Sequence, residues 1–143
     1  MISEYTVAWV AAESPHAREL ALRWIESPQE SVASTGWNTY SGLVALKPDA
    51  ELDLKEVGAL LERVRREIHS APNRVRVCMN NFVIAVGASV KPLLAKSKAA
   101  AKQIGKVEID MGKTARKLPS ALDTIAKVES RGRLGAKRKT VKC

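Results

Sequence analysis

The fold of this chain is indicated most clearly by residues 53–88, which read DLKEVGALLERVRREIHSAPNRVRVCMNNFVIAVGA. Asp53 is a good N-cap residue, Glu56 sits at the capping-box position, and apolar residues then recur at helical spacing. Residues 70–73 break the chain, and a second, more apolar run follows. We interpret that run as the most buried helix, although its β-branched content leaves a strand possible. The stretch therefore predicts a helical hairpin.

A second hairpin is predicted upstream, over residues 14–46. Ser14 and Ser27 are each followed by Pro, the combination of an N-cap residue and a proline at the first helical position. Glu30 occupies the capping-box position after Ser27. Gly36 lies inside the second helix, where it costs about 1 kcal/mol relative to Ala, so we expect a close helix–helix contact there.

The chain after the central hairpin changes character. Lys91-Pro92 opens another helix, which Gly105 closes as the residue after its C-cap. The segment after Gly105 is short and non-periodic, and alternation at Val107 and Ile109 predicts a brief strand or an extended arm. A short helix is predicted over residues 119–131, because Pro119-Ser120 is a helix-start signal.

Helices in pairs at a pitch of about 40 residues are typical of HEAT-type repeats. We therefore predict an all-α fold of antiparallel helix pairs in a HEAT-like α-solenoid of about two and a half repeats. Residues 1–105 are the helical-repeat body, and residues 106–143 are a basic C-terminal arm with one short helix and a mobile tail. A free-standing solenoid usually needs at least three repeats, so we also expect a part of a longer protein.

Charge is distributed unevenly along the chain, whose net charge is +9. Residues 89–143 contain fifteen Lys or Arg against four Asp or Glu, whereas residues 1–88 contain nine against eleven. A charge gathered at one end suggests a surface that meets a polyanion. The terminal run RGRLGAKRKTVKC has no acidic residue, which favours contacts to phosphates over the alternative of a disordered solubilising extension.

Several functional classes find no support in the sequence. Cys78 and Cys143 cannot form a disulfide framework, so a reduced, cytoplasmic setting is expected, with association with the nucleoid. There is no basic leader and no stretch of about 18 apolar residues, so we predict no membrane span. His16 and His69 are far apart, no metal-ligand spacing appears, and no Gly-rich phosphate loop or GxSxG motif is present. We therefore expect no metal and no cofactor.

Three blocks of sequence point to a known family: SPHARELALRWIES, ESVASTGWNTYSGLV and IGKVEIDMGKTARKLPSALDTIAKVESRGRLGAKRKTVKC. In this order they resemble the bacterial DNA alkylation repair proteins, which are built from HEAT-like helical repeats. The chain is most similar to the branch that ends in a Lys/Arg-rich tail, and it matches the C-terminal part of a longer member. The resemblance implies a scaffold that holds duplex DNA on the concave face of its superhelix.

The resemblance also implies a glycosylase site, with a Trp and an Asp on one helix, an Arg on a later helix and a second aromatic around the lesion. The carboxylate would stabilise the positive charge that develops as an alkylated purine departs. In this chain Trp9 is followed one turn later by Glu13, and the Arg position reads Ala33-Ser34. Only Phe82 could serve as the second aromatic. Catalytic residues are therefore unknown.

Polar and aromatic residues within the helices, and the basic end, supply the candidate DNA contacts. Trp37 lies on an apolar stripe, which favours a place in the core; the functional alternative puts Trp37 and Asn38 on the concave face, where they would contact sugar or base. Asn80 and Asn81 are unusual in an apolar helix and either find partners inside the protein or face DNA. The predicted DNA-binding residues are Trp37, Asn38, Asn80, Asn81, Lys106, Lys113, Lys117, Arg131, Arg133, Lys137, Arg138, Lys139 and Lys142.

The functional prediction is a DNA-binding protein of the alkylation repair type that contacts the phosphate backbone of duplex DNA. One hypothesis makes the chain part of a glycosylase that hydrolyses the N-glycosidic bond of alkylated purines. The alternative is a non-enzymatic module that binds DNA or branched DNA. A solenoid that binds other proteins is the third possibility.

Overall fold

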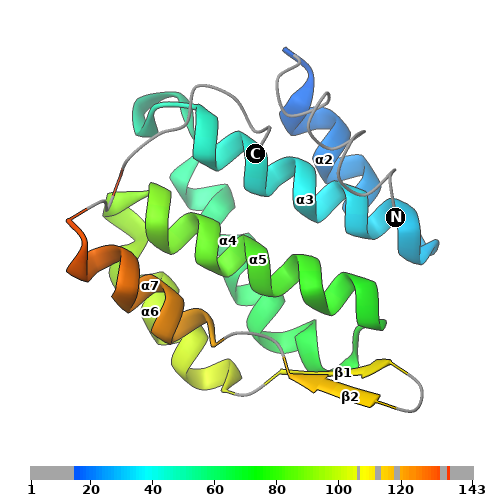
Figure 1. Ribbon diagram of the computed structural model, residues 1–143. Helices are drawn as coiled ribbons and strands as arrows, with labels where there is room; N and C mark the ends of the chain where they lie inside the picture. The colour runs from blue at the N-terminus through cyan, green and yellow to red at the C-terminus, as the bar shows by residue number, and fades with distance from the viewer. Residues whose placement is uncertain (1–14, 106, 112–113, 118–119, 133–134, 136–143) are drawn as a thin grey trace.

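A computed structural model describes residues 15–105, 107–111, 114–117, 120–132 and 135 (Figure 1). The helices are α2 (Ala17–Ile25), α3 (Glu30–Leu46), α4 (Leu54–Glu67), α5 (Asn73–Ser89), α6 (Leu94–Ile104) and α7 (Ala121–Ser130). Short 3-10 turns are η2 (Asp49–Glu51), η3 (Ile68–Ser70) and η4 (Lys91–Leu93). The two strands, described by their backbone, are β1 (Glu108–Met111) and β2 (Thr114–Lys117).

Consecutive helices pair, and the pairs stack into two layers. One layer contains α3, α5 and α7 in that order, and the other contains α2, α4 and α6. Figure 1 shows α5 in front of α4 and α7 in front of α6. We call the layer of α3, α5 and α7 the inner layer. This arrangement confirms the predicted helical solenoid of the HEAT-like type, because neighbouring pairs bury their apolar stripes against each other.

Local sequence signals set several helix ends as expected. The Asp53 carboxylate accepts a hydrogen bond from the backbone N–H of Glu56 at 3.0 Å, which caps α4. Gly105 ends α6 with φ of 66°, a left-handed conformation that favours glycine. Ser120 caps α7 through the N–H of Asp123 at 3.3 Å. These ends were predictable because they depend on residues within one turn.

The predicted capping box at the start of α3 is wrong. Ser27 accepts a hydrogen bond from the N–H of Gln29 at 3.2 Å, outside the helix, and α3 begins at Glu30 without a side-chain cap. The Glu30 carboxylate instead accepts from the backbone N–H of Arg74 at 3.3 Å, in the first turn of α5. The residue before α5 is Pro72, which offers no side-chain acceptor, so a carboxylate from the preceding helix pair fills that role.

Gly36 makes the close helix contact that its position predicted. A Cβ added there would lie 2.6 Å from the backbone nitrogen of Ile25 and 2.9 Å from the Cβ of Trp24. Both atoms belong to α2 or its last turn and cannot move aside without shifting that helix. The two helices of the first pair therefore pack backbone against backbone, which only glycine permits.

The centre of the core is α5, whose apolar run is a helix and not the strand that remained possible. Phe82 is fully buried and makes edge-to-face contacts with Trp37, at a centroid distance of 5.3 Å, and with Tyr40, at 5.8 Å. Edge-to-face geometry places the positive ring edge against the negative face of the next ring. This aromatic cluster joins the first helix pair to the second.

Helix α7, which lies in the segment predicted as the C-terminal arm, packs against α5 and α6. Ile125 is fully buried, and its Cδ1 lies 2.5 Å from the position that a Cβ on Gly87 would take. The absent side chain at Gly87 thus makes room for α7 against α5. The segment between α6 and α7 is an antiparallel hairpin, with Ile109 of β1 opposite Arg116 of β2. The brief strand predicted around Ile109 corresponds to β1 of this hairpin.

Candidate nucleic-acid interface

Two of the predicted DNA contacts lie in the core. The exposed fraction of Trp37 is 1% and that of Asn80 is 2%. Asn80 and Gly87 are seven residues apart, so they share the side of α5 that faces Ile125 of α7. Asn80 has an interaction partner within the protein. Neither side chain presents surface to a ligand, and both are removed from the candidate interface.

Two other predicted residues, on α3 and α5, are at least partly open to solvent. Helix α5 has the other layer behind it and α3 and α7 beside it, so an exposed position on α5 faces outward from the layer. Asn81 of α5 is exposed and Asn38 of α3 is half-buried. Asn38 has an interaction partner within the protein. Ser41, one turn further along α3, donates a hydrogen bond from its hydroxyl to the Trp37 carbonyl oxygen at 2.9 Å. The open face is therefore polar in its middle.

Exposed cations are present on the third helix pair and at the turn that leads into it. Lys127 and Arg131 are exposed on α7 and at its C-cap, and Lys91 is exposed at the turn between α5 and α6. Ion pairs between described residues are Arg18–Glu56, Arg63–Glu26, Arg63–Glu67, Arg65–Glu62 and Lys98–Glu129. None of them involves these three cations. Sequence reasoning missed Lys91 and Lys127, although both belong to the basic segment from residue 89 onward.

Most of the predicted basic contacts lie outside the described residues. These are Lys106, Lys113, Arg133, Lys137, Arg138, Lys139 and Lys142, and the same holds for Trp9 and Glu13. Lys117 is described by its backbone alone, in β2 and opposite Glu108 of β1. Of the candidate residues, Asn38, Asn81 and Arg131 are thus described and solvent-accessible, and Lys91 and Lys127 join them.

A hydrogen-bonded network at the junction of α2, α3 and α4 contrasts with these exposed cations. The Arg18 guanidinium donates from Nε to Glu56 Oε1 at 2.9 Å and from Nη2 to Oε2 at 2.6 Å, and the Tyr40 hydroxyl donates to Oε1 at 2.5 Å. Burial raises the pKa of Tyr40 well above its usual value, and the bond to Glu56 adds to that rise. The same carboxylate raises the pKa of Arg18 by hydrogen bonding.

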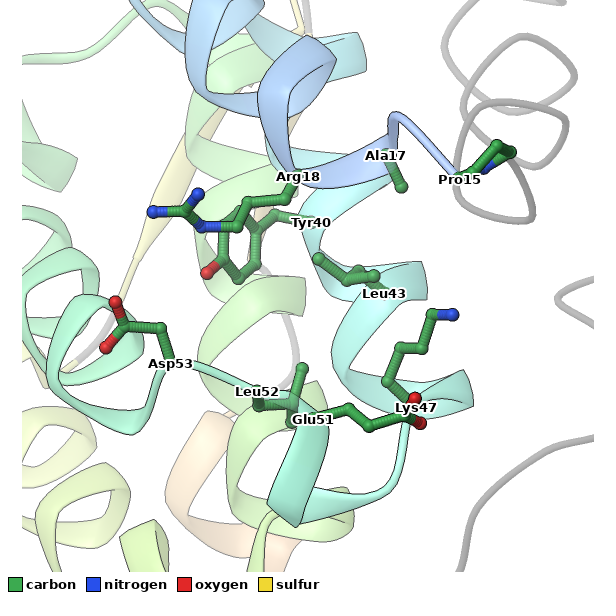
Figure 2. A pocket seen from close by; sticks show the side chains of 9 residues that line it. All are labelled: Pro15, Ala17, Arg18, Tyr40, Leu43, Lys47, Glu51, Leu52 and Asp53. Atoms are coloured by element: carbon green, nitrogen blue, oxygen red, sulfur yellow. The ribbon is translucent and has the colours of Figure 1, made fainter.

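A small cavity opens beside this network (Figure 2). Its volume is about 170 Å³. Figure 2 shows the Arg18 side chain lying alongside the Tyr40 ring. The cavity is lined by Pro15, Ala17, Arg18, Tyr40, Leu43, Lys47, Glu51, Leu52 and Asp53. Ligand pockets usually enclose roughly 300–1,000 Å³, so this junction is small for an organic ligand.

A second cavity, of about 300 Å³, lies between the α2–α3 turn, the end of α4 and the start of α5. It contains Ala33, the position at which the family resemblance expects an arginine. Its three carboxylates have protein partners: Glu26 and Glu67 both pair with Arg63, and Glu30 binds the first turn of α5. Glu26 and Glu30 therefore link neighbouring helix pairs, Glu67 pairs within α4, and none of the three is a ready equivalent of the expected catalytic Asp.

Two further features of the described residues bear on the type of site. Among them, no three His, Cys, Asp or Glu side chains come together in a way that could hold a metal ion. No single described helix has the length and apolar content to cross a membrane, although α5 and the segment Lys91–Ile104 meet that criterion jointly across a bend of 116°.

Comparisons with known proteins give relatives that are longer than this chain. No family model matches the chain. An uncharacterized protein of Listeria innocua (Lin0241) is 35% identical over 127 residues, which cover 89% of this chain and 54% of that protein. An uncharacterized protein of Listeria monocytogenes (Lmo0209) is 34% identical over the same length and coverage. The chain thus spans about half the length of the curated relatives that it matches.

A solved structure matches the entire fold. Its TM-score is 0.94 and its sequence is 38% identical, over 100% of this chain and 61% of that one. It represents a new family of proteins related to the HEAT-like repeat DNA glycosylases, with affinity for branched DNA structures. This chain has the HEAT-like repeat fold. The match includes all three helix pairs, so the basic third pair is part of the shared architecture.

Proposed function

We propose that this chain is a DNA-binding module of the family related to the HEAT-like repeat DNA glycosylases and that it binds branched DNA. The observation that carries this proposal is the match, along the whole chain, to a structure whose protein has affinity for branched DNA. The exposed cations beside the open face of the inner layer add to it. We also propose a cytoplasmic protein that acts on nucleoid DNA.

The proposed contacts divide into two kinds. Lys127 and Arg131 neutralise phosphates and release counterions, which supplies affinity without reading sequence. The side-chain amides of Asn38 and Asn81, on the middle of the open face, can hydrogen-bond sugar or phosphate oxygens. A surface that combines cations at its edge with neutral amides at its centre suits a backbone-binding protein. It offers no described aromatic platform for stacking single-stranded bases.

We further propose that binding proceeds without glycosylase chemistry in this chain. The support is the cavity that Ala33 lines. The exposed fraction of Ala33 is 7%. The carboxylates of the cavity, those of Glu26, Glu30 and Glu67, all have partners within the protein. A glycosylase needs a carboxylate directed at the departing base and its sugar. The alternative of a glycosylase fragment requires those groups to come from elsewhere.

Fluorescence anisotropy with a four-way junction, a fork and a linear duplex of equal length, over a series of salt concentrations, tests the proposal. We expect the junction to bind most tightly. The triple variant Lys91→Gln/Lys127→Gln/Arg131→Gln should flatten the dependence of log K on log salt by about 0.9 for each phosphate that is no longer neutralised. The control, Arg23→Gln/Lys55→Gln/Arg66→Gln, removes the same charge from exposed positions of α2 and α4.

Three outcomes would count against the proposal. Equal loss of affinity in both variants would mean that net charge matters and the inner layer does not. Binding that is absent at low salt would favour the protein-binding alternative. Release of free purine from alkylated DNA by this chain would support the glycosylase hypothesis in place of a binding module.

A further inference from the structure

Helix α6 differs in charge from the other two helices of its layer, which we call the outer layer. Residues 91–105, which contain η4 and α6, have four lysines and no acidic residue. Helices α2 and α4 each contain both signs of charge, and arginines from both form ion pairs, Arg18 with Glu56 and Arg63 with Glu26. Unbalanced positive charge in the outer layer is therefore confined, among the described helices, to α6.

Burial along α6 shows which of its sides is free. The side that packs against other helices carries Ser97, Ala100, Ala101 and Ile104. The exposed residues, which we call the α6 face, are Ala95, Lys96, Ala99, Lys102 and Gln103. Helix α6 contacts α5 and α7 of the inner layer and α4 beside it, and Figure 1 shows α7 in front of α6. The α6 face is therefore directed away from the inner layer.

One lysine of the α6 face lies over a glycine of α4. A Cβ on Gly58 would have three atoms of the Lys96 side chain as its nearest neighbours, Nζ at 3.0 Å, Cε at 3.6 Å and Cδ at 3.7 Å. Gly58 is buried inside α4, where glycine is a poorer helix former than alanine, and its backbone has no positive φ that would require glycine. What the glycine provides at this position is room for the Lys96 side chain.

The chemistry of the α6 face suits a polyanion. Neither Lys96 nor Lys102 has an ion pair with another described residue, whereas Lys98, at the edge of the face, pairs with Glu129 of α7. The residues between the lysines are alanines, so a phosphate backbone can approach the helix closely. Large apolar and aromatic side chains, in which protein–protein interfaces are enriched, are absent from the five residues of this face. Compact ammonium groups are ordinary phosphate ligands.

The position of the α6 face matters because duplex DNA is stiff. Asn81 of α5 is exposed on the inner layer, and the α6 face is directed the opposite way. Two layers of helices make a body about 20 Å thick. The persistence length of duplex DNA is about 500 Å, so a linear duplex on one side cannot bend around such a body to reach the other. Two arms that leave a branch point can reach both sides at once.

We propose that the α6 face is a second phosphate-binding surface, which holds a second duplex arm of branched DNA while the first arm lies on the inner layer. This inference rests on the proposed binding of branched DNA and names the surface that distinguishes a branch from a linear duplex. When one arm is bound, the branch point keeps the other at a high effective concentration near the α6 face. A linear duplex has no second arm and receives no such increase in affinity.

The variant Lys96→Gln/Lys102→Gln tests this surface by fluorescence anisotropy. We expect affinity for a four-way junction to fall about fivefold or more and affinity for a linear duplex to change less than about twofold. The dependence of log K on log salt should flatten by up to about 1.8 for the junction, which is 0.9 for each of two phosphates, and stay unchanged for the linear duplex. The control, Arg23→Gln/Arg66→Gln, removes the same charge from exposed positions of α2 and α4 and should leave the preference for the junction intact.

The role of Gly58 is tested by Gly58→Ala, which keeps every charge and fills the space under Lys96. We expect junction affinity to fall about two- to threefold in the native background and not to fall further in the Lys96→Gln background, because the two residues act through one contact. Urea unfolding should show the variant at least as stable as the native chain, which excludes unfolding as the cause. Equal losses in both backgrounds would overturn this role of Gly58, while the lysine variant would still decide the α6 face.

Acetylation of lysines followed by mass spectrometry locates the contact directly. The junction should protect Lys96 and Lys102 from the reagent and the linear duplex should not, whereas Lys127, a proposed contact of α7, should be protected by both. Equal protection of the two α6 lysines by both DNAs, or equal loss of affinity for both, would overturn the inference and leave DNA binding intact. Absence of protection by the junction would also overturn it and would leave an acidic protein as the occupant of the α6 face. A native chain that binds the junction no better than the linear duplex would instead defeat the proposed function, and this inference with it.

Discussion

The first two helix pairs and the third pair use their charged side chains differently. In the first two, Arg18 of α2 pairs with Glu56 of α4, and Arg63 of α4 pairs with Glu26 after α2. These bonds cross from one pair to the next. In the third pair Lys98–Glu129 joins α6 to α7, and exposed cations such as Lys127 have no ion pair with another described residue. Among the described residues, ion pairs cross from one helix pair to the next in the first two pairs, whereas the ion pair of the third joins its own two helices.

The two regions also differ in how they pack. Trp37, Tyr40 and Phe82 fill the space between the first pair and the second. The third pair contributes the small buried residues Ala100 and Ala101 and the aliphatic residues Ile104 and Ile125. Because buried aromatic area dominates core energetics, most of the stability should reside in the first two pairs. Substitutions on the surface of the third pair can then alter binding without unfolding the chain.

Glycine substitutions in the first two helix pairs should give the largest change in the free energy of unfolding. Gly36→Ala should lower the free energy of unfolding by about 2–3 kcal/mol, because the new Cβ meets the backbone of α2. Gly58→Ala should raise it by up to about 1 kcal/mol, because its neighbour is the flexible Nζ of Lys96, 3.0 Å away, and alanine favours the helix. Urea unfolding measures both, and equal destabilisation would contradict the packing described for the first pair.

A pH dependence is expected from Tyr40. Its pKa is raised in the folded state, so the unfolded chain loses this proton first, from about pH 10. The stabilisation is complete below that pH, and the free energy of unfolding should fall by up to about 1.4 kcal/mol per pH unit above it, until the folded-state pKa is reached. Tyr40→Phe should remove this part of the slope. A slope that the variant leaves unchanged would assign it to other groups.

Removal of a single cation should distinguish the two regions by a smaller amount. Arg18→Gln should cost about 1 kcal/mol of stability, because it breaks a partly exposed, two-bond pair with Glu56. Lys127→Gln should change stability by less than about 0.5 kcal/mol and reduce affinity for DNA. Thermal unfolding and fluorescence anisotropy of the two variants measure stability and DNA affinity. A larger loss of stability in Lys127→Gln than in Arg18→Gln would contradict the difference described between the two regions.

The smallest expected effect concerns two buried serines. Among the described residues the Ser97 hydroxyl of α6 has no hydrogen-bond partner, whereas Ser34 of α3 donates to the Glu30 carbonyl oxygen at 2.8 Å. Ser97→Ala should stabilise the protein by about 0.5–1 kcal/mol, because an unsatisfied buried hydroxyl is costly and alanine favours the helix. Ser34→Ala should gain less or reduce stability. Calorimetry that shows equal gains would remove this distinction.

Agreement between the predicted and observed helix ends depends on the range of the interaction. Asp53 and Gly105 act within one turn, and both were predicted correctly. Ser27 was predicted to cap α3, but the carboxylate of Glu30 is drawn to the N–H of Arg74, which is distant in sequence. The same applies to the candidate site. Asn80 and Asn81 are adjacent in sequence, yet one is buried and the other exposed, because segments distant in the sequence pack against one side of α5.

By itself, the sequence determined the helices, their pairing, the contact at Gly36 and the concentration of positive charge after residue 88. These features depend on periodicity, on residues a few positions apart and on composition. Only the tertiary structure decided that Trp37 is in the core, that α7 completes a third pair and that Gly135 meets Ala88. The physical reason is that the side of a helix left to solvent is set by whichever distant segments pack against it, and a local pattern carries no record of them.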